Sequence, residues 1–144
     1  MTAPSVHIRS VALFERPVTL RLPFRFGAAT VTRCPQAFVR VTVDVAGQPH
    51  HGASAELMVP KWFDKAPALT HEQNFEQLRE ALRCAREAYG AAGVQPSAYA
   101  LSHTAGEDAI AAAVARGLPR LAAQFGPAQL DKAVADAVLR AVGQ

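Results

Sequence analysis

Phe38-Val39-Arg40-Val41-Thr42-Val43-Asp44-Val45 is the stretch that decides the fold class of this 144-residue chain. Valine occupies every second position, and phenylalanine, arginine, threonine and aspartate fill the positions between. A period of two is typical of a β-strand with one buried face, and valine packs well on such a pleated surface. We therefore predict a strand over about residues 37–46, with partner strands on either side in the sequence.

Two neighbouring segments are predicted to pair with this strand. Val6 and Ile8 alternate with polar residues, so a first strand is expected over about residues 6–15, and its looser second half suggests a bulge. After the turn Ala46-Gly47-Gln48-Pro49, in which Gly47 can take a positive φ, a third strand rich in small residues is expected over 51–56. Small residues leave room for another element to pack closely. Together the segments predict a three-stranded antiparallel β-meander.

The second half of the chain has the period of helices. Thr70-His71-Glu72-Gln73 is a capping box at the start of a helix over about 71–89. Its apolar residues fall on one stripe, at Phe75, Leu78, Leu82, Ala85 and Tyr89. The stretch from about residue 91 to residue 104 has no clear helical or strand pattern. Three further helices are predicted over about 105–116, 118–125 and 128–142. Thr104 is a possible N-cap of the first, and glycine and proline residues interrupt the helical pattern between them.

Strands followed by helices indicate the α+β class, here a meander followed by a bundle of three to four helices. The length fits a single domain over residues 1–144. Cys84 is expected on a helix and Cys34 in a loop, both as reduced thiols. No apolar run approaches the length of a membrane span, and the N-terminus lacks the shape of a signal peptide, so a cytoplasmic protein is expected.

Two loops have an unusual composition. The segment from Arg16 to Pro35 is too long for a simple hairpin turn, and its prolines exclude a central strand. It contains Phe24-Arg25-Phe26, a guanidinium between two aromatic rings. The segment from Leu57 to Pro67 contains Lys61-Trp62-Phe63, with the only tryptophan. Long ordered loops of this kind are typical of ligand-contacting elements.

Patterns that carry catalysis or metal binding are not found in the sequence. No two histidines have the helical spacing that favours a zinc site, and His50-His51 follows a turn where solvent-exposed residues are expected. There is no phosphate-binding glycine loop and no nucleophile elbow. The net charge of +3 comes with scattered arginines rather than a basic run, so nucleic acid is not expected as a partner.

Several short runs, taken in order, resemble the start of enolase-superfamily enzymes, and most closely the mandelate racemase and muconate lactonizing branch. The resemblance covers about Val6 to Gly143, and Ala133–Leu139 looks like the last helix of that region. It implies the N-terminal capping domain, which in this family covers the mouth of a modified TIM barrel. The matching runs are Pro23–Gly27, Thr30–Arg33, Phe38–Val43 and His51–Glu56.

The resemblance also implies that the catalytic groups lie in the barrel and not in the capping domain. In the family, barrel strands supply the acid–base groups and the three carboxylates that bind Mg²⁺, and no residue of this sequence inherits those roles. The chain alone is therefore not expected to be an enzyme, whereas a full-length parent would be a Mg²⁺-dependent lyase or isomerase acting on a carboxylate substrate. The expected partners are a barrel of the same or a companion chain and further copies of the protein. The chain is either a fragment of such an enzyme or a solitary capping domain.

The two unusual loops correspond to those with which the family closes its active site. Carried over by residue, Phe24, Arg25, Phe26, Lys61 and Trp62 become the expected substrate-binding residues. Their rings would exclude water, and Arg25 or Lys61 would meet a substrate carboxylate. Alternatively the rings anchor the loops on the domain's own core. A second function also stays open, in which Lys61-Trp62-Phe63 forms the hot spot of a non-enzymatic interaction or self-association module.

Overall fold

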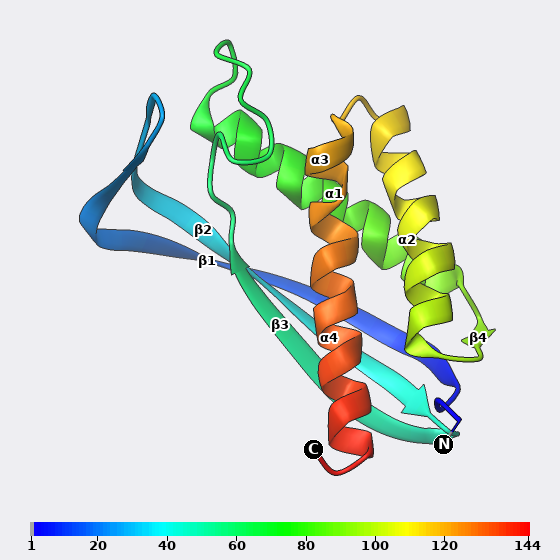
Figure 1. Ribbon diagram of the computed structural model, residues 1–144. Coiled ribbons are helices and arrows are strands. Elements are labelled where there is room, and N and C mark those ends of the chain that lie inside the picture. The colour runs from blue at the N-terminus through cyan, green and yellow to red at the C-terminus, as the bar shows by residue number, and fades with distance from the viewer. Residues whose placement is uncertain (1) are drawn as a thin grey trace.

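The computed structural model describes residues 2–144 and consists of one antiparallel sheet with helices packed on one of its faces (Figure 1). The strand order is β3-β2-β1-β4, so the first three strands form the expected meander and a short fourth strand extends it. The α+β class is therefore confirmed. The elements are β1 (Val6–Phe26), β2 (Ala29–Val45), β3 (Gln48–Leu57), α1 (His71–Ala91), β4 (Val94–Gln95), α2 (Ala98–Ala115), α3 (Arg120–Ala123) and α4 (Phe125–Ala141).

The prediction of a long loop between the first two strands is wrong. β1 continues to Phe26 and β2 begins at Ala29, so the strands form one long hairpin with the turn at Gly27-Ala28. Pro17 lies opposite Pro35 in this ladder. Among residues 2–144, strand β1 has no partner on its other side beyond His7, and β2 has none before Gln36. Edge strands tolerate proline, which is why the prolines did not end the strands at 15 and 37 as predicted.

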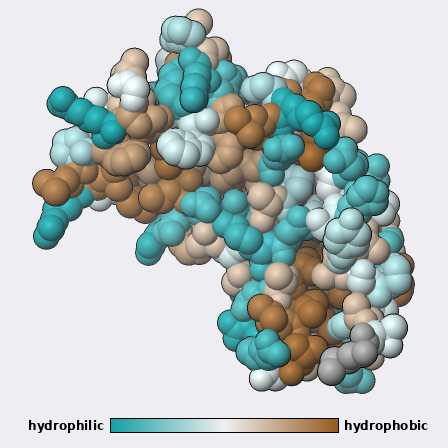
Figure 2. Space-filling view, in the orientation of Figure 1, coloured by the Kyte–Doolittle hydropathy of each residue, from teal (hydrophilic) through white to brown (hydrophobic). Residues whose placement is uncertain are grey.

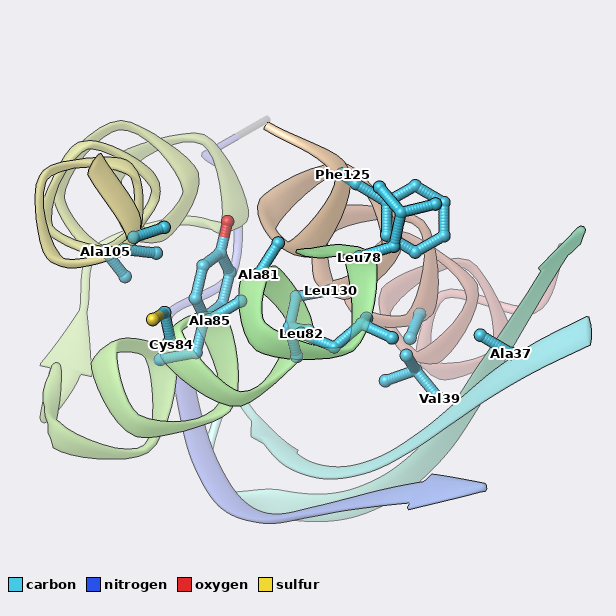
Figure 3. Packing of buried hydrophobic residues seen from close by; sticks show 14 of the residues in the cluster. Ala37, Val39, Leu78, Ala81, Leu82, Cys84, Ala85, Ala105, Phe125 and Leu130 are labelled. Atoms are coloured by element: carbon cyan, nitrogen blue, oxygen red, sulfur yellow. The ribbon is translucent and has the colours of Figure 1, made fainter. Parts of the chain in front are cut away.

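The valines of β2 form the floor of the core, as predicted. Val39, Val41, Val43 and Val45 are all buried, whereas Arg40 between them is exposed. Figure 3 shows Val39 and Ala37 of β2 on the side of the sheet on which α1 places Leu78 and Leu82. The hydrophobic face of the sheet is therefore the face that carries the helices.

The third strand is longer than predicted, at Gln48–Leu57 rather than 51–56, and its small residues admit a helix. A Cβ atom at Gly52 would overlap the carbonyl oxygen of Ala133 and would lie 2.9 Å from Cβ of Ala137. The expected close packing is thus realised by α4. The preceding turn has positive φ at Ala46 (50°) as well as at Gly47 (82°), so the expectation for Gly47 is confirmed.

The first helix follows its sequence signals. The capping box is formed, with the Gln73 amide donating to Thr70 Oγ1 at 3.2 Å and the Thr70 amide donating to Gln73 Oε1 at 2.7 Å. All five residues of the predicted stripe are buried. The helix ends at Ala91 instead of 89, before Gly93 with its positive φ of 67°.

The remaining helix boundaries correct the predictions. Helix α2 begins at Ala98 rather than 105, because Ser97 and not Thr104 is the N-cap, with Ser97 Oγ accepting from the Ala100 amide at 3.1 Å. The stretch without a clear pattern therefore holds β4 and the first turns of α2. Cys34, predicted in a loop, lies buried in β2, and Cys84 lies in α1 as expected; both thiols are free.

Gly126-Pro127 does not separate two helices as predicted. Helix α3 is a single turn at Arg120–Ala123, and α4 begins at Phe125 with Pro127 in its first turn. Proline is tolerated there because the first amides of a helix have no partner within the helix. A Cβ atom at Gly126 would overlap the carbonyl oxygen of Ala81, so this glycine lets α4 cross α1 closely. The predicted bounds 118–125 and 128–142 are corrected accordingly.

Candidate functional site

The tip of the β1–β2 hairpin and the loop after β3 come together at one end of the molecule (Figure 1). The ring of Phe26 lies edge-on to the indole of Trp62, with 5.5 Å between the centroids and 73° between the planes. The ring of Phe24 lies 5.4 Å from that of Phe26. Three of the five expected site residues therefore form one aromatic cluster.

The rings differ in how far they are buried. Phe24 is 50% exposed and Trp62 is 54% exposed, so neither is a core anchor, whereas Phe26 is partly buried and packs against the core. The anchor of the second loop is Phe63, whose ring lies 5.3 Å from the buried ring of Phe125 in α4. The alternative expected from the sequence, that Phe24, Phe26 and Trp62 fix their segments to the core, thus applies to Phe26 among these three rings.

The Lys61 ammonium group is bound within its own loop. Its Nζ donates to the carbonyl oxygen of Ala66 at 2.7 Å and to that of Leu69. Its backbone has a positive φ of 62°, and its amide donates to Oδ1 of the buried Asn74 at 3.1 Å. Lys61 therefore stabilises the loop, and its charge is directed at backbone carbonyls.

Asp64 completes the support of this loop. Its carboxylate accepts from Gln77 Nε2 at 2.8 Å and from the Ala66 amide at 3.0 Å. The hydrogen bond from Gln77, followed by that from Ala66, holds the pKa of Asp64 below its ordinary value. The carbonyl oxygen of Asp64 accepts from Asn74 Nδ2 at 3.3 Å. Sequence reasoning missed Asn74 and Gln77, because their position on the first turns of α1 gives no sign of the loop they hold.

Arg25 is an exposed cation at the tip of the hairpin. It lies on β1 opposite Thr30, next to the turn, and makes no ion pair with any residue from 2 to 144. Its guanidinium group is therefore free to meet an anion at the hairpin tip. Of the two cations expected at the site, Arg25 is the one not already bound.

Beside the cluster lies a cavity of about 660 Å³, which we call the aromatic hollow. Its lining includes Phe24 of the hairpin, Trp62 and Phe63 of the loop after β3, Leu121 of α3 and Phe125 of α4. Figure 2 shows hydrophobic residues gathered on the surface over the hairpin and the loop after β3. No pattern in the sequence indicates this hollow, because its wall from α3 and α4 lies far along the chain from both loops.

Polar groups line the edge of the aromatic hollow. Lys132 Nζ of α4 pairs with Glu56 Oε2 of β3 at 3.0 Å, and both side chains are about half exposed. Gln129 is only 4% exposed and also lines the hollow. Its Oε1 atom is buried and has no hydrogen-bond partner among the described residues.

The arginines that are scattered in the sequence follow the two long strands. Arg9 of β1 binds the carboxylate of Asp44 at 2.7 Å. Farther along, the Arg16 guanidinium lies 5.4 Å from the ring centroid of Phe38, and that of Arg40 lies 5.4 Å from the ring of Phe14. These pairs lie away from the aromatic hollow, and Arg25 is the arginine that lies next to the turn of the hairpin.

Within residues 2–144 no group of three or more histidine, cysteine, aspartate and glutamate side chains is placed to hold a metal ion. His51, expected to be exposed, is exposed, and its Nδ1 lies 3.2 Å from Thr42 Oγ1. None of the helices in this part of the chain is both long and apolar enough to cross a membrane.

Comparison with protein-family models, with curated proteins and with solved structures gives no match for this chain.

Proposed function

We propose that this chain is the substrate-specificity capping domain of an enzyme of the enolase superfamily, of the mandelate racemase and muconate lactonizing kind. The observation that carries the proposal is the contact between Phe26 and Trp62. It brings the two loops singled out by the sequence resemblance to one place, beside a hollow of a size typical for small molecules. The proposed substrate is a small organic carboxylate.

In this proposal the chain shapes the pocket and a barrel performs the chemistry. A barrel with bound Mg²⁺ would supply the acid–base chemistry on the carboxylate substrate, and this chain would supply none of it. The described residues offer no ligand group for that ion, so we assign no metal-binding role to this chain. Phe24 and Trp62 exclude water from the mouth of the pocket. Arg25 is free to bind a carboxylate, whereas the Lys61 ammonium is occupied by two carbonyl oxygens.

The test is to determine the gene sequence beyond Gln144 and to assay the chain together with the barrel encoded there or nearby. In the assembled enzyme, Arg25→Ala should raise KM several-fold and change kcat little if Arg25 contributes equally to binding of substrate and transition state. Arg21→Ala is the matched control, because Arg21 is also an exposed arginine of β1 and does not lie at the tip. Absence of an encoded barrel would remove the enzyme proposal.

A second candidate is an interaction module that pairs with itself or with another protein. The observation that favours it is the exposure of large apolar side chains around the hollow, with Leu121 at 55% in addition to Phe24 and Trp62. Exposed apolar patches often mark interaction sites. Analytical ultracentrifugation of the 144-residue chain tests this candidate: a monomer at high concentration argues against self-association.

A further inference from the structure

We propose that the aromatic hollow binds a small aromatic molecule that bears an uncharged hydrogen-bond donor, and that Gln129 accepts this hydrogen bond. The inference deepens the proposed function and rests on it for the hollow being part of a substrate pocket. It adds which chemical group the pocket selects. The volume of about 660 Å³ lies well within the range of small-molecule sites.

The first step of the argument is the orphaned acceptor. Gln129 Oε1 is buried and has no partner in the described part of the chain, although nearly all buried side-chain oxygens in proteins have one. The backbone of the same residue is satisfied, since its carbonyl oxygen accepts from Ser54 Oγ at 2.8 Å. The helix around Gln129 is therefore well placed, and the unused hydrogen-bonding capacity lies in its side-chain amide, whose Oε1 is the buried atom.

The second step is the position of this acceptor. Gln129 follows Phe125 by one turn of α4, so both lie on the same face of the helix, and both line the hollow. The terminal torsion of a glutamine side chain is soft. A rotation of the amide can therefore present Oε1 to a molecule in the hollow without moving the helix. The rings of Phe63, Phe125 and Trp62 provide the surface against which an aromatic molecule would pack.

The third step is the charge of the hollow. Its two ionic side chains, Lys132 and Glu56, neutralise one another at 3.0 Å. The remaining wall is predominantly apolar, and desolvating a charged ligand there would be costly without a free counter-ion. An uncharged donor such as a phenol hydroxyl or an amide is therefore favoured over an ammonium group. The carboxylate of the proposed substrate would lie outside the hollow, toward Arg25 and the barrel.

The experiment compares 4-methylphenol with 4-methylanisole, which has a similar size and no donor hydrogen. Each is titrated into the ¹⁵N-labelled 144-residue chain while the indole N–H signal of Trp62 is followed by NMR, since Trp62 is the only tryptophan and lines the hollow. We expect 4-methylphenol to bind about tenfold more tightly, which corresponds to roughly one net hydrogen bond. In Gln129→Met, which keeps the length and removes the amide, the two probes should bind equally.

Two further readouts keep the test decisive. Gln129→Met should unfold at a higher denaturant concentration, because it removes a buried acceptor without a partner, so loss of discrimination cannot be ascribed to unfolding. Gln124→Met is the matched control, since Gln124 is exposed and lines the same hollow; it should keep the preference for 4-methylphenol. Equal affinities in the unaltered chain, or a preference retained in Gln129→Met, would overturn the inference. So would indole shifts that depend on protein concentration without any probe, because a second copy would then fill the hollow.

The readout does not use enzyme activity. A chain without a barrel that still discriminates the two probes would support the binding site and refute the capping role. A barrel-dependent enzyme whose domain binds both probes equally would do the reverse. The two proposals can therefore fail separately.

Discussion

Gly52 of β3 and Ala133 of α4 are in such close contact that a Cβ atom on the glycine would overlap the carbonyl oxygen of the alanine. Two hydrogen bonds flank this contact. The Ala53 amide donates to Asp136 Oδ2 at 2.9 Å, and Ser54 Oγ donates to the Gln129 carbonyl oxygen at 2.8 Å. The backbone of the third strand is therefore the surface on which α4 rests, and Gln129 is positioned by it.

Gly52→Ala should strongly destabilise the protein. The added methyl group meets backbone atoms of Ala133 and Ala137, which cannot move aside as a flexible side chain would. Overpacking of a core typically costs about 1–3 kcal/mol, and we expect at least about 3 kcal/mol here. Urea unfolding followed by circular dichroism measures the change.

The control for this substitution is Gly90→Ala. Gly90 lies in α1 and is exposed, and no neighbouring atom lies within 4 Å of the position that an added methyl group would take. Alanine is a better helix former than glycine by about 0.5–1 kcal/mol, so this variant should be more stable than the unaltered chain. Changes of the same sign in both variants would contradict the close contact at Gly52.

The sequence predicted those parts of the fold that depend on local pattern. The alternating valines of β2 and the capping box at Thr70 appear in the structure as expected. The long hairpin is not predicted, because proline is excluded from central strands, whereas Pro17 and Pro35 face each other on strands with open edges. Gly126-Pro127 predicts a helix end, but Gly126 lies within α4 and allows this helix to cross α1 closely. Contacts between distant segments decided these cases.

The residues of the candidate site also fall into those that the local sequence predicts and those that depend on tertiary contacts. The aromatic composition of the two loops marked Phe26 and Trp62, and the structure places them in contact. Gln129 and Asn74 were not foreseen, since a glutamine or asparagine on an amphipathic helix is usually exposed. Both are buried here, because a loop or a strand from another part of the chain covers them. Their role depends on tertiary packing that a helical pattern does not contain.

Phe26→Ala should uncover Trp62. The edge-on contact at 5.5 Å is lost, and such aromatic pairs contribute about 0.5–1.5 kcal/mol beyond their buried area. The indole becomes more hydrated, so its fluorescence maximum should shift to longer wavelength. Emission spectra with excitation at the single tryptophan measure the shift.

Phe14→Ala is the matched control for this change. Phe14 is also a phenylalanine of β1 and is 51% exposed, and its ring packs with Arg40 far from the hairpin tip. Its removal should leave the emission maximum unchanged. An unchanged maximum in Phe26→Ala would show that the two loops do not meet in solution.

Glu80→Gln should weaken the dependence of stability on acid. The Glu80 carboxylate in α1 binds Arg116 beyond α2 and Arg83 at 2.7 Å, and these hydrogen bonds, that from Arg116 first, lower the pKa of Glu80 below its ordinary value of 4.5. A lowered pKa in the folded state means that the stabilisation is present above pH 4.5 and is lost as the pH falls through the folded-state pKa. The free energy of unfolding of the unaltered chain should therefore decrease more steeply below pH 4.5 than that of the variant.

Glu107→Gln serves as the comparison for acid stability. Glu107 pairs with Arg120 at 3.3 Å, but both side chains are 61% exposed, and exposed pairs contribute little. The acid limb of this variant should follow that of the unaltered chain in urea titrations between pH 3 and pH 7, about the range in which carboxylates titrate. If the unfolding free energy of both variants depends less steeply on pH to a similar extent, the ion pair between Glu80 and Arg116 contributes no more than an exposed pair.

Tyr89→Phe should destabilise the junction of α1, α2 and α4. The buried hydroxyl of Tyr89 donates to Asp131 Oδ1 at 2.6 Å, and Ser102 Oγ donates to Oδ2 at 2.8 Å. Without the hydroxyl, one carboxylate oxygen loses its donor in a partly buried place, at a cost of about 1–3 kcal/mol. Tyr99→Phe is the control, because Tyr99 is 81% exposed, and its unfolding free energy should be unchanged.

The buried hydroxyl of Tyr89 should also make the folded protein less stable at alkaline pH. Burial, and then the hydrogen bond to Asp131, raises the pKa of Tyr89 above its ordinary value of 10.0. The unfolded chain therefore ionises this tyrosine near pH 10 while the folded chain keeps it protonated, so stability is retained below that pH and falls above it. In Tyr99→Phe, Tyr89 is the only tyrosine left, and its phenolate absorbance should appear only together with loss of the circular dichroism signal. A phenolate that forms in the folded chain near pH 10 would show that the hydroxyl is open to water and that Asp131 does not hold it.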